Sequence, residues 1–173
     1  MKFEIDFRGY HNRLFEMIKN LLRQKKNLIL DAWIQSILET YPSESSDFLK
    51  HQRNQFSNPV GYIISDTVEK IFDAILNDSH IVEIKLLVVD LIRIRAVQNF
   101  LPSQAVGFVF SLKKVIRDVL KQEFKNEDLS NELLEFETKI DMVALIVFDL
   151  YMEAREKVFQ IRVNEMKNSV YQK

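Results

Sequence analysis

The stretch RIRAVQNFLPSQAVG, residues 93–107, ends one apolar helix and begins the next. The run that leads into it, residues 81–97, is apolar on nearly every side, which is typical of a helix packed on several faces. We therefore expect this run to be the central helix of the fold. Pro102 has no backbone N–H and suits a first helical turn, so the break between the two helices is predicted at residues 100–102.

The apolar stripe of this central helix continues into two polar side chains. Steps of three and four residues connect Ile81, Ile84, Val88, Leu91, Arg95 and Gln98. Because a buried guanidinium without partners is very unfavourable, we predict a partner for Arg95. The alternatives are a carboxylate, such as Asp90 or Asp149, or exposed carbonyls at a helix end.

The rest of the chain predicts about seven helices in an all-α bundle. Residues 1–9 alternate charged and apolar residues and are expected to form an N-terminal arm. Helical periodicity then follows in residues 10–26, in residues 27–41, and in a short segment around Phe48 and Leu49. Asn58-Pro59 is the clearest helix start, with Asn as the cap and Pro at the first position. Beyond the central helix, one helix is predicted from Pro102 to about residue 124 and a last one from about residue 133.

The last helix is expected to exceed 35 residues, because no Gly or Pro follows Gly107. Two series with a seven-residue spacing run along it: Ile140, Val147, Ala154 and Ile161, and Ala144, Tyr151, Val158 and Glu165. Such spacing is typical of helices that pair in coiled coils, so we predict a dimer helix with Val147, Ala154, Val158 and Ile161 at its contact. The alternative is a long core helix that frays beyond Glu165, with residues 166–173 as its tail.

Composition bounds the class of protein. The 173 residues suit a single domain, residues 1–173. A net charge of −1 offers no basic field for nucleic acid or anionic lipid. The absence of cysteine excludes disulfides, thiolate catalysis and Cys-based zinc sites. No apolar run reaches the length of a signal peptide core or a membrane span, so we expect a cytoplasmic protein.

No catalytic, cofactor-binding or metal-ligating residues are predicted. His11, His51 and His80 fall on different predicted elements without a ligand spacing. The three glycines form no phosphate-binding loop, and Gly107 is expected at a close helix crossing. Ser103 has no local histidine base. An enzyme is therefore disfavoured.

Three segments carry a resemblance to a known family. They are RIRAVQNFLPSQAVGFVFSLK, the preceding Asn58-Pro59-Val60-Gly61, and the later Asp149-Leu150-Tyr151-Met152 with Arg155-Glu156-Lys157. From about Leu30 to Glu165 the chain resembles the N-terminal domain of RsbR and RsbRD proteins, the stressosome components also called RsbT co-antagonists. The resemblance implies a haem-free, globin-like fold that dimerises and whose long last helix leads into a STAS domain. This chain ends after that helix, so we expect a freestanding module without the STAS domain.

The candidate structural or partner-contact residues are Arg93, Arg95, Gln98, Asp149, Tyr151 and Arg155. The first three either tie the central helix to Asp141 or Asp149, or face a pocket or partner. Three functions stay open. The first is a homodimeric signalling module, with STAS-domain or other regulatory proteins as further partners, that relays binding of a small apolar ligand or a protein through its last helix. The second is a haem-binding globin using His80 or His51, and the third is an accessory subunit of another complex.

Overall fold

The computed structural model describes residues 7–42, 46, 49, 56–98, 100–124 and 130–171. All regular structure in these ranges is helical, which confirms the predicted all-α class with a long C-terminal helix. The helices are α1 (Phe7–Gln24), α2 (Lys26–Leu38), α4 (Pro59–Leu76), α5 (Ile81–Val97), α6 (Pro102–Glu123) and α7 (Ser130–Tyr171). The short helix predicted around Phe48 and Leu49 falls largely outside the described residues.

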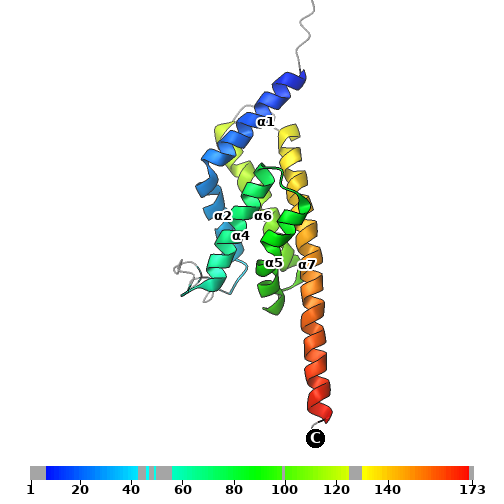
Figure 1. Cartoon of the computed structure of the whole chain (residues 1–173). Coiled ribbons are helices and arrows are strands. Elements are labelled where there is room, and N and C mark those ends of the chain that lie inside the picture. Colours follow the sequence, from blue (N-terminus) through cyan, green and yellow to red (C-terminus); the bar gives the residue numbers. More distant parts are fainter. Residues whose placement is uncertain are drawn as a thin grey trace, which may run out of the picture.

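Helix α7 determines the shape of the molecule (Figure 1). Its first half packs along α5 and α6, and its second half continues well beyond the other helices. The first half belongs to the core, because Phe136, Ile140, Val143, Val147 and Tyr151 are fully buried. The helix continues through Tyr171, so residues 166–171 of the expected frayed tail are helical.

Helix α5 is less enclosed than predicted. One face is buried, through Ile84, Val88, Leu91 and Ile92. The opposite face is open, since Val82 and Val97 are exposed and Leu86 is 72% exposed. Helix α5 does contact α4, α6 and α7, so the prediction of packing on several faces holds for those sides and is wrong for the face of Val82, Leu86 and Val97.

Local sequence chemistry sets the helix ends. Asn58 Oδ1 accepts a hydrogen bond from the Gly61 N–H at 2.8 Å, and Pro59 occupies the first turn of α4. Helix α6 begins at Pro102, where Gln104 Oε1 accepts from the Leu101 N–H at 3.1 Å.

Two local expectations are corrected. A side chain at Gly107 would meet open space, so this glycine marks no close helix crossing. Residues 7–9 of the expected arm already belong to α1, and the remainder of that arm lies outside the described residues.

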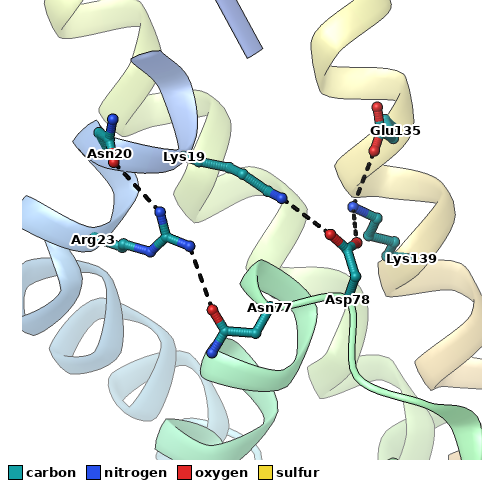
Figure 2. Close-up of polar contacts among 7 residues, drawn as sticks. All are labelled: Lys19, Asn20, Arg23, Asn77, Asp78, Glu135 and Lys139. Carbon is teal, nitrogen blue, oxygen red and sulfur yellow. Dashed lines mark hydrogen bonds and ion pairs between the residues drawn. The ribbon is translucent and has the colours of Figure 1, made fainter. Parts of the chain in front are cut away.

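The turn between α4 and α5 ties three parts of the bundle together (Figure 2). Asp78 adopts a left-handed conformation (φ 56°) just after α4. Its carboxylate binds Lys19 Nζ of α1 at 3.0 Å and Lys139 Nζ of α7 at 2.5 Å. Both ammonium groups also lie about 5 Å from the Phe15 ring, which stacks on Phe136. The turn therefore fixes the start of α7 against α1 and α4.

This arrangement makes the Asp78 junction sensitive to pH. The hydrogen bond from Lys139 outweighs the opposing effect of partial burial and, together with the bond from Lys19, holds the pKa of Asp78 below its usual range. A carboxylate whose pKa is lower in the folded state stabilises the fold above its unfolded pKa of about 3.9. That contribution is lost as the pH falls through the folded pKa.

We predict that Asp78→Asn lowers the free energy of unfolding by about 1 kcal/mol at neutral pH, since the side chain is 53% exposed and partly screened. Asparagine tolerates the left-handed conformation, so the substitution removes mainly the charge. Urea unfolding should show the gap to the natural protein closing as the pH is lowered below the usual aspartate pKa. Asp90→Asn is the control, because that exposed carboxylate contacts only Arg93 of its own helix among the described residues. A gap that persists in acid would contradict the ionic origin.

Candidate functional site at the end of α5

The end of α5 encloses a buried cation. The side chain of Arg95 is fully buried. Its Nη1 donates to the Gln104 carbonyl at 2.9 Å, and its Nη2 donates to Thr40 Oγ1 at 3.1 Å. These partners come from the first turn of α6 and from the residues after α2, so Arg95 joins three segments.

Of the two kinds of partner predicted for Arg95, the carboxylate is wrong, and a backbone carbonyl, that of Gln104, is present. Asp90 contacts Arg93 at the surface, with 3.4 Å between Oδ1 and Nη1, and Asp149 is exposed. Asp141, the other expected anchor, pairs with Lys113 at 2.6 Å. The cation is therefore held by neutral oxygen acceptors rather than by an anion.

Aromatic rings complete the surroundings of the guanidinium. Its carbon lies 4.7 Å from the Phe100 ring centroid, 4.8 Å from that of Phe108 and 5.5 Å from that of Tyr41. The negative faces of the rings compensate part of the lost hydration. Burial lowers the pKa of Arg95, with the nearby Tyr41 opposing this effect, and an arginine nevertheless stays protonated at neutral pH. Burial likewise raises the pKa of Tyr41.

Helix α7 closes this corner from the other side. Tyr151, which is fully buried, donates its hydroxyl hydrogen to the Phe100 carbonyl. Arg155 Nη1 donates to the Ala96 carbonyl at 3.0 Å. Because Ala96 lies in the last turn of α5, the Arg155 cation also meets the negative end of that helix. We call Arg95, Phe100, Gln104, Tyr151 and Arg155 the α5–α6 corner.

The structure thus gathers three of the six candidate residues and separates the others. Arg95, Tyr151 and Arg155 meet at the α5–α6 corner, whereas Arg93, Gln98 and Asp149 are exposed. Among the predicted dimer residues, Val147 is fully buried in the core, so its assignment to a dimer contact is wrong. Ala154 and Val158 are half-buried, and Ile161 is exposed.

The contacts of Arg95 with Thr40 and Tyr41 were not predicted from the sequence. Thr40 and Tyr41 lie more than 50 residues away along the chain, and nothing in their local pattern indicates a cation. The motif Pro102-Ser103-Gln104 offers a weak signal, since it places a first helical turn directly after the arginine.

The side chains of Arg95, Tyr151 and Arg155 in the α5–α6 corner all donate hydrogen bonds to backbone carbonyls. The residues of this corner do not include a nucleophile paired with a base. His80 caps α5 instead, where its Nδ1 accepts from the Val82 N–H at 3.3 Å, and its side chain is exposed. His51 and the side chain of His11 lie outside the described residues. Within the described ranges, no cluster of His, Asp or Glu has the arrangement of a metal site. No helix in the same ranges is long and apolar enough to cross a membrane.

Two substitutions at Arg95 should separate the contribution of its side-chain volume to stability from the contribution of its charge. We predict that Arg95→Ala lowers the free energy of unfolding by about 3 kcal/mol, because it leaves a cavity among three rings. Arg95→Met should stay within about 1.5 kcal/mol of the natural protein, because an apolar side chain of similar length avoids the desolvation of a charge. In the natural protein Thr40 Oγ1 donates to the Ile37 carbonyl at 2.6 Å, and this hydrogen bond does not involve Arg95. Equal losses in the two variants, measured by denaturant unfolding, would show that the charge itself is required.

Comparison with known proteins places this chain in a family. A family model described as the RsbT co-antagonist protein RsbRD N-terminal domain matches residues 28–166, which include all of the α5–α6 corner. The chain is also similar to an uncharacterized protein of Archaeoglobus fulgidus, at 27% identity over 143 residues that cover 79% of this chain and 82% of that protein. No solved structure matches the chain. Because the family model spans most of its length, the chain belongs to the RsbT co-antagonist RsbRD N-terminal domain family.

Proposed function

We propose that this protein is a non-enzymatic, cytoplasmic signalling module. In this proposal, two copies pair through α7, and an input received by the helical bundle passes along α7 to regulatory partners such as STAS-domain proteins. Membership of a stressosome-type signalling family supports the general role. The observation that carries the proposal is the exposed apolar face of α7.

This face repeats every seven residues. Leu145, Met152, Phe159 and Met166 are 61%, 47%, 66% and 59% exposed, and we call these four residues the α7 seam. Exposed apolar side chains at a seven-residue spacing are typical of one contact position of a coiled coil. The second half of α7 extends beyond the bundle (Figure 1), so a second helix can approach it without obstruction from the other described helices.

The α7 seam differs in phase from the predicted dimer residues. Val147 and its neighbours in that series face the bundle along the first half of α7, whereas the α7 seam faces away from it. Val147, Ala154 and Ile161 each lie two residues after a position of the α7 seam, which is about 200° around a helix, and Val158 lies one residue before Phe159, about 100° around it. The proposal therefore transfers the dimer contact from Val147, Ala154, Val158 and Ile161 to the α7 seam.

Helix α6 extends the same face. Lys113 pairs with Asp141 at 2.6 Å and Arg117 pairs with Glu137 at 2.5 Å, so α6 and α7 run antiparallel in a fixed register. One turn further along each helix, this register brings Phe110 level with Leu145. Both side chains are exposed, so the proposed dimer surface includes α6 as well as α7.

The α5–α6 corner supports the proposed relay. Tyr151 binds the Phe100 carbonyl in the α5–α6 connection, and Arg155 binds the Ala96 carbonyl in the last turn of α5. Both attachments lie between the buried half and the extended half of α7. A change in the position of α5 would break these bonds or move α7 with them. An input in the bundle therefore has a physical route to the α7 seam.

A second candidate, an accessory subunit of another complex, is favoured by the open face of α5. Val82, Leu86 and Val97 are exposed there, with Arg93 and Gln98 on the same part of the helix. Exposed apolar side chains flanked by polar ones are typical of contact surfaces. The two candidates differ in which helix carries the interface.

We predict that Phe159→Glu converts the dimer into a monomer, because it places a carboxylate in the apolar contact of the α7 seam, where burying an unpaired charge is unfavourable. Light scattering coupled to size-exclusion chromatography at tens of micromolar should report twice the chain mass for the natural protein and the single chain mass for this variant. Asn164→Glu, which adds the same charge on another side of α7, should remain dimeric. A natural protein that is monomeric at this concentration would overturn the proposal, as would a dimer that tolerates Phe159→Glu.

A further inference from the structure

We propose that a cavity between α4, α5 and α7 binds a small neutral apolar molecule with one hydrogen-bonding group. The inference deepens the signalling role proposed above by naming the chemical class of the input. Only the effect of ligand binding on signalling rests on that proposed role, because the cavity is argued from the geometry of its lining residues.

The cavity has a volume of about 220 Å³ and opens to solvent. Its apolar lining comes from the end of α4, the start of α5 and the first half of α7, through Ala74, Ile75, Ile81, Ile84, Met142 and Ile146. For scale, an enclosed apolar cavity of about 150 Å³ holds benzene. The larger volume here suits a bicyclic aromatic molecule of roughly nine non-hydrogen atoms.

Part of the lining is in contact with water in the free protein. Ile81 is 39% exposed and Met142 is 47% exposed. A ligand that covers these side chains removes apolar surface from water at both its own face and theirs, which is the main driving force for such binding. The exposed apolar lining therefore favours the binding of an apolar ligand.

The polar groups of the lining select against a charged ligand. Lys139 already binds Asp78 and Glu135, and Asp78 also binds Lys19, so two cations and two anions pair with one another (Figure 2). A ligand charge would have to displace one of these ion pairs. Ser79, which is half-buried, lines the cavity and offers a hydroxyl group to a neutral hydrogen-bonding ligand.

Binding here would act on α7 directly. Met142 and Ile146 lie between the Asp78 junction at the start of α7 and Tyr151 at the α5–α6 corner. A ligand that contacts α4, α5 and α7 together favours the arrangement in which these helices are docked. It can shift an equilibrium only by its difference in affinity for the docked and undocked states.

The test uses the full chain with methyl-labelled Ile and Met, titrated with indole and followed by NMR. We expect saturable shifts at Ile81, Ile84, Met142 and Ile146. Ile81→Trp, which fills the mouth of the cavity, should weaken indole binding at least tenfold, whereas Leu86→Trp on the open face of α5 should leave it within twofold. Indole-3-acetate, which adds a carboxylate, should bind at least tenfold more weakly than indole.

Several outcomes would overturn the inference. They are the absence of saturable shifts with indole, shifts that Ile81→Trp leaves unchanged, and tighter binding of indole-3-acetate than of indole. The Phe159→Glu variant keeps the result separate from the dimer proposal, because it should bind indole as the natural protein does. A natural protein that is monomeric and still binds indole would thus count against the α7 seam alone, and a dimeric natural protein that does not bind indole would count against the cavity alone.

Discussion

One buried cation, the guanidinium of Arg95, joins three segments of the fold. Arg95 has no carboxylate partner among the described residues, so the cost of removing its guanidinium from water must be offset by several weaker contacts at once. Those contacts come from the residues after α2, from the α5–α6 connection and from α6 itself. Two of the three guanidinium nitrogens donate hydrogen bonds, while the buried Nε has no partner among the described residues. A packing that separated these segments would leave the cation with still fewer partners, which is unfavourable for a buried charge.

Helix α7 is attached to this arrangement at two levels. Near its start, Lys139 meets Asp78, and further along, Tyr151 and Arg155 bind carbonyl groups of the α5–α6 corner. The interval between them contributes fully buried side chains to the core. Beyond Arg155 the helix has few neighbours and exposes Phe159, Ile161 and Met166. One helix thus serves as a core element in its first half and as a projecting rod in its second.

The parts of the structure that were predictable from the sequence are those decided locally. Asn58-Pro59 and Pro102 marked helix starts because capping and the missing proline N–H act within one turn. Steps along α5 predicted that Arg95 would be buried, but its partners Thr40 and Tyr41 are distant in sequence. The sequence also did not predict which side of α7 faces the bundle. Val147 and Leu145 belong to series with the same seven-residue spacing, and only tertiary packing decides which one faces the bundle.

The projecting half of α7 explains why pairing and sensing would be linked. A helix of about 20 residues, roughly 30 Å long, is only marginally stable when it is isolated in water. In the proposed dimer, its stability comes from the docked half on one side and from the partner helix on the other. Any event in the bundle that alters the docking of Tyr151 or Arg155 changes the first of these supports. Under this proposal the balance between the two supports then shifts, and a small change at the α5–α6 corner reaches the α7 seam through one continuous helix.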